Sequence, residues 1–337
     1  MNTHSAVDRV ATESAFSGVV RVDRGADTEL LAAYGDADRR WGIANTPETR
    51  FATASGTKGL TALAVVTLIE DGTLGLATTA RSLLGDDLPL IDDAVTVEQL
   101  LAHRSGIGDY LDEDVEMDRN DYLMPVPVQR LVGTEDFVVV LDGFPTKFPP
   151  GEQFSYCNGG YMVLALIAER ASGVPYHDLV AQRVCAPAGT IDTEFLRSDE
   201  LPGRTAVGYL DVDGHWRSNV FHLPVRGNGD GGVYTTVADL RILWTALFGG
   251  RIVSMDWVGE MTRPRSAVPA ESMRYGLGFW LHETGDAVLL VGGDTGVSLW
   301  SAHDPTRDLT CTVISNTSDG AWPIARVLAD LIAPMGV

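Results

Sequence analysis

The chain has 337 residues, of which 45% are hydrophobic, and a formal net charge of −21. This composition predicts a globular protein of one large or two ordinary domains, with ample material for a core. The strong negative charge excludes nucleic acid and anionic membrane surfaces as partners unless a basic patch exists, and Arg39-Arg40 is the only adjacent basic pair.

The first predicted elements are strands at 16–23 and 29–34, joined by a hairpin turn that begins at Gly25. Residues 56–71 predict a helix that is apolar nearly all round, and a helix of this kind is buried. Ser55 therefore lies at the N-terminus of a central helix. Free N–H groups and the helix dipole favour negative charge at that position.

The rest of the chain is predicted to be mainly helical at first and then to mix helices with strands. Between about 76 and 204 we predict helices at 96–103, 134–142, 159–172 and 176–184. After a Gly-rich loop at 227–232 we predict a helix at 236–248, strands at 277–282, 286–291, 297–303 and 309–316, and a last helix at 321–334. Strands at both chain ends with helices between them predict an α+β fold, with one sheet built from both ends and an inserted helical lobe.

Composition also bears on the compartment and on ligands. The cysteines Cys157, Cys185 and Cys311 are odd in number and have no CxxC spacing, which argues against disulfides and zinc. No stretch reaches the ~18 apolar residues of a membrane helix, and the N-terminal residues do not resemble a signal peptide. We therefore expect a cytoplasmic protein with no membrane partner, no metal and no cofactor; the sequence does not indicate its oligomeric state.

A serine and a lysine form the first candidate catalytic pair. The chain has only two lysines, Lys58 and Lys147, and the first stands three residues after Ser55 in Ser55-Gly-Thr-Lys58. This spacing places the amine on the same helical face as the hydroxyl. Unlike Arg, a buried Lys can lose its proton, so the pair suits a nucleophile and its base. Ser-x-x-Lys alone is a weak motif, and so is the second element, Tyr156-Cys-Asn158.

Together with three further segments, these motifs carry a family resemblance. Ser55 to Lys58, residues 100–106 (Leu-Leu-Ala-His-Arg-Ser-Gly), 150–161, 229–240 and 293–298 occur in the order and spacing of the serine β-lactamase/penicillin-binding-protein superfamily. The chain most resembles the branch of class C β-lactamases, D,D-carboxypeptidases and family VIII esterases. The resemblance implies a β-lactamase/transpeptidase-like fold, an antiparallel sheet with flanking helices.

The resemblance also implies how the domain is organised and where the chain departs from the pattern. We expect a single catalytic domain over 1–337, with an α/β part at about 10–75 and 205–337 and a helical lobe at about 76–204. The family's third motif, Lys-Thr-Gly or His-x-Gly, falls on 290–292 or, shifted by one residue, on 291–293, and neither register has a cation. In the lactamases and peptidases that cation helps hold a substrate carboxylate, so its loss disfavours those activities here.

From these residues we expect an acyl-enzyme mechanism. Ser55 attacks an acyl carbon, Lys58 accepts the hydroxyl proton, and Tyr156 shares that proton and passes it to the leaving group. Asn158 orients Lys58 and the substrate. The oxyanion lies between the backbone N–H groups of Ser55 and Gly293, with Gly292 as the donor if the register shifts.

The predicted function is a serine hydrolase acting on a small neutral or cationic ester or amide, esterase-like. The alternatives are an acyltransferase that uses the same serine, a D,D-peptidase or β-lactamase, and a non-catalytic binding protein on this fold, since fold does not fix function.

Other patterns are set aside. The GxGxxG run at 227–232 lies outside any βαβ unit, so we expect a turn at the rim of the cleft. The acid-rich stretch 109–121 lacks the glycine and glutamate of a calcium loop and is interpreted as a solvated loop that borders the cleft. His103 is expected to be a structural hydrogen-bonding residue, and Cys157 a packing residue.

Overall fold

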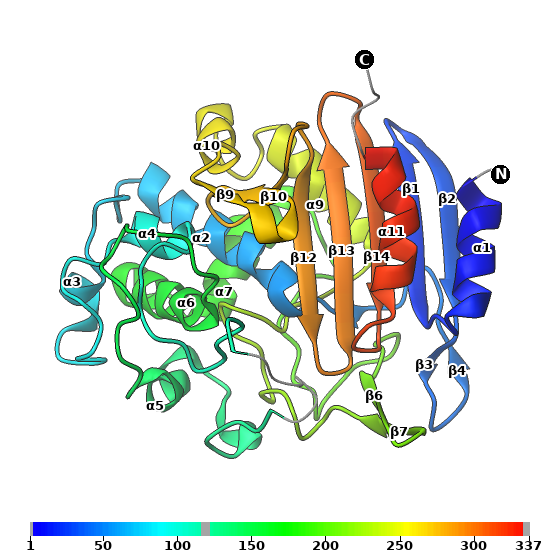
Figure 1. The fold of residues 1–337 in the computed structure, drawn as a ribbon, viewed down its shortest axis with the longest axis horizontal. Coiled ribbons are helices and arrows are strands. Elements are labelled where there is room, and N and C mark those ends of the chain that lie inside the picture. The colour runs from blue at the N-terminus through cyan, green and yellow to red at the C-terminus, as the bar shows by residue number, and fades with distance from the viewer. Residues whose placement is uncertain (1–2, 116–121, 333–337) are drawn as a thin grey trace.

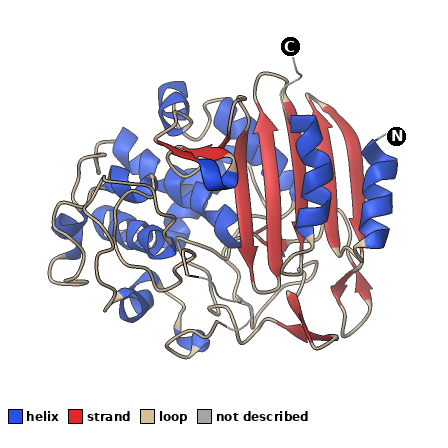
Figure 2. Cartoon of the chain, viewed as in Figure 1, coloured by secondary structure: helices blue, strands red, loops and turns tan. Residues whose placement is uncertain are grey.

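The computed structural model describes residues 3–115 and 122–332. Its central feature is an eight-stranded sheet in the order β2-β1-β14-β13-β12-β11-β10-β9, in which neighbouring strands are antiparallel (Figures 1 and 2). The strands are β1 (Gly18–Arg24), β2 (Asp27–Tyr34), β9 (Ser266–Val268), β10 (Met273–Tyr275), β11 (Trp280–His282), β12 (Val288–Asp294), β13 (Val297–Asp304) and β14 (Leu309–Ser315). Because β1 pairs with β14, with Gly18 opposite Ser315, the two ends of the chain share one sheet, as predicted.

Helices cover both faces of this sheet. On the face towards the viewer in Figure 1, α1 (Thr3–Glu13) and α11 (Ala321–Ile332) lie side by side. They enclose an apolar core that includes Val7, Val20 and Leu328. The opposite face packs against α2 (Thr57–Glu70) and α9 (Val237–Phe248). Strands β13 and β14 are buried along their whole length because both of their faces are covered.

The helical part of the molecule lies beyond β12, on the side away from β1 and β2 (Figure 1). Its core is the contact between α2 and α6 (Asn158–Ser172), both of which are buried along most of their length. The remaining helices are α3 (Ala80–Leu84), α4 (Val97–Leu101), α5 (Val138–Leu141), α7 (Tyr176–Val180), α8 (Ala186–Ala188) and α10 (Met255–Met261). Three small two-stranded sheets complete the fold: β3 (Asp36–Asp38) with β4 (Ile43–Ala44), β5 (Phe51–Ala52) with β8 (Tyr234–Thr235), and β6 (Tyr209–Val212) with β7 (His215–Ser218).

Most predicted elements are confirmed, and two of them differ in extent from the structure. The predicted strand 277–282 begins only at Trp280, because Gly278 has a φ of +88° and lies against Ala62 of α2. The predicted helix 134–142 is a 3₁₀ turn followed by the four-residue α5. Helix α1 was not predicted, and the last two positions of the predicted helix 321–334 lie outside the described residues. Across residues 3–115 and 122–332, no helix combines the length and apolar character required to cross a membrane.

Candidate active site

Ser55 lies in a tight turn between the sheet and the central helix. It is the middle residue of the 3₁₀ turn η1 (Ala54–Gly56), directly before α2. Strand β12 approaches this turn so closely that a Cβ atom at Gly292 would lie 2.1 Å from the carbonyl oxygen of Thr53 and 3.0 Å from the amide nitrogen of Ser55. Only glycine permits this approach.

Lys58, on the first turn of α2, points back to the serine from a buried position with 2% relative exposure. Its Nζ contacts three oxygens: Oγ of Ser55 at 2.9 Å, Oδ1 of Asn158 at 2.7 Å and the backbone carbonyl of Asp230 at 2.9 Å. Three oxygen partners match the three hydrogen atoms of an ammonium group. The amine is therefore held in one orientation by three separate segments of the chain.

Asn158, the first residue of α6, is itself held by several groups. Asp109 accepts its backbone N–H at 2.6 Å and that of Gly159 at 2.8 Å, so this carboxylate stabilises the N-terminus of α6. The Asn158 amide nitrogen donates to the Leu111 carbonyl at 3.1 Å and to Glu113 at 3.2 Å. The amide oxygen is thereby left to face Lys58.

Asp109 corrects the expectation of a solvated acidic loop over 109–121. Its side chain is 7% exposed, and burial raises the pKa of Asp109 to about 6, although the backbone N–H groups that it accepts oppose the shift. The expectation of solvent exposure is wrong for Asp109, because this carboxylate stabilises the buried N-terminus of α6. Positions 116–121, which include most of the centre of the stretch that was compared with a calcium loop, lie outside the described residues.

Tyr156 presents its ring to the amine, with the ring centroid 4.9 Å from Nζ of Lys58. The ring stacks on that of Trp280, with centroids 5.9 Å apart, and contacts the His103 ring at a tilt of 34°, with centroids 4.3 Å apart. His103 is structural, as expected: its Nδ1 accepts the backbone N–H of Cys157 at 3.0 Å, and burial, followed by the charge of Lys58, lowers the pKa of His103. Cys157 is buried, and its sulfur accepts an N–H at the start of α6.

A cavity of about 840 Å³ opens over Ser55. Its lining includes Ser55, Tyr156, Trp280 and the two glycines of β12, together with the carboxylates Glu113, Asp114 and Glu271. The described part of the acidic loop thus does border the cleft.

All six predicted site residues lie in this region. Ser55, Lys58 and Asn158 are in direct contact, whereas Tyr156, Gly292 and Gly293 line the same cavity as the serine. Sequence reasoning missed the Asp230 carbonyl and Asp109. Asp230 could have been found, because it lies in the 229–240 segment that carried part of the resemblance. As expected, the 227–232 run forms a turn, in which Asn228 and Gly231 exchange backbone hydrogen bonds.

Comparison with known proteins gives a consistent result. Residues 5–333 match the family model described as Beta-lactamase. A crystal structure of a penicillin-binding protein from Bacillus halodurans superposes with a TM-score of 0.90 at 33% identity, covering 96% of this chain and 99% of that one. A D-aminopeptidase of Brucella anthropi is 25% identical over 93% of this chain and 58% of its own length. Esterase EstB of Burkholderia gladioli is 30% identical over 60% of this chain and 53% of its own length. The chain also spans 63% of the length of the putative penicillin-binding protein PbpX of Bacillus subtilis.

Proposed function

The chain belongs to the beta-lactamase family, a family of serine hydrolases, and within it we propose that this protein cleaves a small neutral or cationic ester or amide through an acyl-enzyme on Ser55. Relatives named as an esterase and as a D-aminopeptidase support an ester or amide as the bond cleaved. The three buried, unpaired cysteines fit a reducing compartment, which supports the cytoplasm as the proposed location.

The contact between Lys58 and Ser55 carries the proposal. The Asn158 amide oxygen and the Asp230 carbonyl can only accept hydrogen bonds, so Nζ must donate one N–H to each. The remaining direction of the nitrogen points at Oγ of Ser55, 2.9 Å away. In a neutral amine this direction holds the lone pair, so the two fixed acceptors aim the base at the hydroxyl proton.

The steps follow from this geometry. In acylation, Oγ of Ser55 bonds to the acyl carbon while its proton moves to Nζ of Lys58. The bond to the leaving group then breaks, and the leaving atom takes that proton through the hydroxyl of Tyr156. In deacylation, water adds to the acyl carbon and gives its proton to the same pair, after which Oγ leaves and recovers a proton.

Strand β12 supplies the proposed oxyanion donor. His282 donates its backbone N–H to Ala287 at 2.9 Å at the hairpin between β11 and β12. Consecutive residues of an antiparallel strand direct their backbone N–H groups to opposite sides of the strand. The N–H groups of every second residue from Leu289 to Gly293 therefore face the β11 side. Pairing with β11 stops at Leu289, so the N–H of Gly293 faces an open edge. We therefore assign Gly293, with the N–H of Ser55, to the oxyanion.

The missing cation of the third motif favours substrates without a carboxylate. In the register 290–292, Leu290 would stand at the position of that cation, and its side chain packs against Gly59 in α2, where a Cβ would lie 2.4 Å from it. Lys147, the other lysine, is paired with Asp112 at 2.9 Å and with Asp114 at 2.6 Å, so its charge is already balanced. An ester or amide without an anionic group fits this cleft better than a penicillin or a D,D-peptide.

Intact-mass spectrometry after treatment with a fluorophosphonate tests the proposal. We expect one adduct per chain, lost in Ser55→Ala, together with release of p-nitrophenol from short neutral esters. Full labelling of Ser55→Ala would place the nucleophile elsewhere. A stable adduct with a fluorescent penicillin, combined with silence towards esters, would favour the peptidase instead.

A further inference from the structure

The amine of Lys58 has two acceptors besides Ser55, and one short segment of the chain contacts both of them. The acceptors are the amide oxygen of Asn158 and the backbone carbonyl of Asp230, which come from different parts of the fold. The segment is 109–111, in the loop after α4. Because the two acceptors aim the amine at Oγ of Ser55, the groups that hold the acceptors also set the direction of the amine.

The first contact of the segment is with Asn158. The backbone carbonyl of Leu111 accepts the side-chain N–H of Asn158 at 3.1 Å, and the carboxylate of Asp109 accepts its backbone N–H at 2.6 Å. Asp109 also accepts the backbone N–H of Leu111 at 3.3 Å, which closes the segment on itself. The segment therefore fixes both the backbone and the side-chain amide of Asn158.

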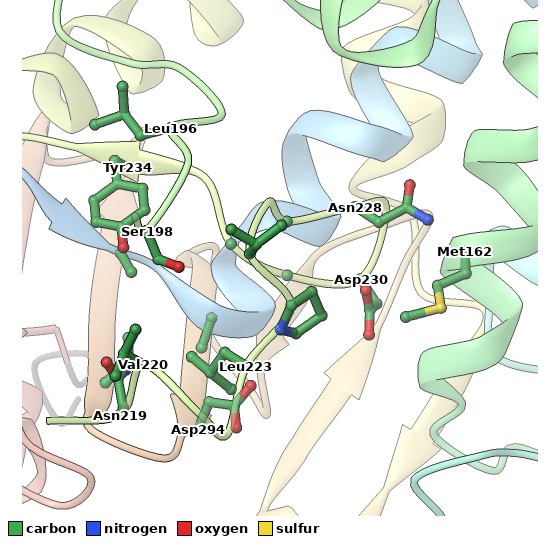
Figure 3. Close-up of a pocket in the computed structure, with 18 of the residues that line it drawn as sticks. Met162, Leu196, Ser198, Asn219, Val220, Leu223, Asn228, Asp230, Tyr234 and Asp294 are labelled. Atoms are coloured by element: carbon green, nitrogen blue, oxygen red, sulfur yellow. The ribbon is translucent and has the colours of Figure 1, made fainter. Parts of the chain in front are cut away.

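The second contact joins Tyr110, the middle residue of the segment, to Asp230. The hydroxyl of Tyr110 donates to Oδ2 of Asp230 at 2.6 Å. Burial, followed by the charge of Asp230, raises the pKa of Tyr110, so the phenol keeps its proton and remains a donor. Figure 3 shows Asp230 on the turn 227–232, where its side chain lines a cavity that Tyr110 also lines.

The backbone around Asp230 depends on such contacts, because both of its neighbours in the chain are glycines. Gly229 and Gly231 have no side chain, which gives their backbone wide conformational freedom. The Gly229 carbonyl accepts the hydroxyl of Thr61 in α2 at 2.6 Å, which fixes the peptide before Asp230. The Tyr110 hydroxyl fixes the Asp230 side chain, and the two contacts together set the direction of the Asp230 carbonyl.

We propose that Tyr110 is a positioning residue for acyl transfer, which acts through Asp230 to hold the amine of Lys58 in line with the hydroxyl of Ser55. The inference rests on the proposed acyl-enzyme function and adds to it a residue outside the three hydrogen-bond partners of Lys58 Nζ. Displacement of a catalytic group by about 1 Å can cost 10²-fold in rate. Loss of the Tyr110 hydroxyl should therefore slow the reaction without weakening the binding of substrate.

Tyr110→Phe tests the inference, because it removes one oxygen and keeps the ring. With a neutral p-nitrophenyl ester we expect kcat to fall by about tenfold and KM to stay within about twofold of the wild type. The final extent of fluorophosphonate labelling should stay complete, since the protein remains folded. A change in KM alone, or a kcat that falls only in proportion to the labelled fraction, would overturn the inference.

Two variants of Asp230 separate position from charge. Asp230→Asn keeps an oxygen that can accept the Tyr110 hydroxyl, so kcat should stay within about threefold of the wild type, whereas Asp230→Ala should lose about as much as Tyr110→Phe. The double variant Tyr110→Phe/Asp230→Ala should lose no more than either single variant, because both changes remove the same contact. Losses that add in the double variant would show that Tyr110 does not act through Asp230.

Tyr34→Phe is the matched control. The hydroxyl of Tyr34 also donates to an aspartate, Oδ1 of Asp8, at 2.7 Å. This pair joins β2 to α1 at the β2 edge of the sheet, away from β12. The control variant should leave kcat and KM unchanged.

Nuclear magnetic resonance of the lysines tests the inference without turnover. The chain has only two lysines, so protein labelled with ¹³C at lysine Cε gives two methylene groups, and Lys147→Arg identifies that of Lys58. We expect the two Hε protons of Lys58 to differ in chemical shift because the amine has one orientation, and this difference to shrink in Tyr110→Phe but not in Tyr34→Phe. An unchanged difference in Tyr110→Phe would refute the inference even if the wild type cleaves esters. The expected change in a protein that leaves esters intact would count against the proposed function alone.

Discussion

The amide oxygen of Asn158 lies 2.7 Å from Nζ of Lys58, closer to the amine than Oγ of Ser55 at 2.9 Å. The contact joins the first residue of α6 to the first turn of α2, so the packing of two buried helices fixes the direction of the amine. Two rigid elements hold such a contact more precisely than a loop would.

Replacement of the base should abolish acylation while leaving the fold intact. Lys58→Arg keeps a positive charge, but a guanidinium does not release its proton, so kcat/KM for a p-nitrophenyl ester should fall by about 10²–10⁴-fold. Stopped-flow measurement of the p-nitrophenol burst checks this. Lys147→Arg at the other lysine is the control and should retain the burst; a normal burst in Lys58→Arg would exclude Lys58 as the base.

The hydroxyl of Tyr156 should matter more than its ring. Tyr156→Phe keeps the ring contacts with Trp280 and His103 and removes only the oxygen, so the melting temperature should change little. We expect kcat for an alkyl ester to fall by about 10²–10⁴-fold, since the alkoxide leaving group loses its proton donor. A p-nitrophenyl ester, whose leaving group needs no proton, should lose much less; equal losses for the two esters would argue against proton transfer by Tyr156.

Gly292 should tolerate no side chain. A Cβ there would lie 2.1 Å from the Thr53 carbonyl, so Gly292→Ala must push β12 away from the nucleophile turn. We expect a loss of about 1–3 kcal/mol in the free energy of unfolding and a larger proportional loss of kcat/KM. Gly259→Ala in α10, where a Cβ would meet nothing within 4 Å, is the matched control and should not destabilise the protein.

Asp109 should make stability depend on pH between about 4 and 6. Its folded-state pKa of about 6 lies above the usual aspartate value of 3.8, so the folded protein holds the proton more tightly than the unfolded chain does. Stability from this group is therefore present below the unfolded value and is lost as pH rises through 6. The loss is on the order of 3 kcal/mol.

Urea unfolding of the wild type and of Asp109→Asn at pH 4, 5, 6 and 7 measures this effect. The asparagine side chain cannot titrate. The unfolding free energy of the wild type should therefore fall relative to that of Asp109→Asn as pH rises. Parallel curves for the two proteins would contradict the assignment.

Salt should relieve discrimination against anionic substrates. Glu113, Asp114 and Glu271 line the cavity over Ser55, so an ester with a carboxylate should react more slowly than its neutral analogue at low ionic strength. The Debye length falls to about 10 Å at 0.1 M salt, and the gap in kcat/KM should narrow between 10 and 300 mM NaCl. An unchanged gap would show that charge repulsion does not govern selectivity.

Much of the fold could be predicted from the sequence, because hydrophobic patterning reports burial directly. Strands β13 and β14 and helices α2 and α6 are long and strongly apolar, and their predicted limits agree with the structure to within a few residues. The short elements were missed or misplaced, because tertiary contacts decide them. The turn that moves the start of β11 to Trp280 depends on the contact of Gly278 with Ala62, which is far away in the sequence.

The candidate site was predictable where chemistry follows local spacing. The relation of Ser55 to Lys58 is set within a single helical turn, so the sequence indicates it. The Asp230 carbonyl is a backbone group, which has no signature in the residue type, so only its place in the 229–240 segment of the family resemblance could have indicated it. Asp109 was misread because its acidic neighbours predict solvent exposure, whereas the N-terminus of α6 keeps it buried.

The pairing of β1 with β14 has a consequence for synthesis on the ribosome. Gly18 is translated about 300 residues before its partner Ser315. At about 5–20 residues per second, the nascent hairpin of β1 and β2 must wait for tens of seconds with one edge unpaired. Because β12, which forms a wall of the turn that holds Ser55, is also made late, the cleft over Ser55 cannot assemble until residues 288–294 have been translated.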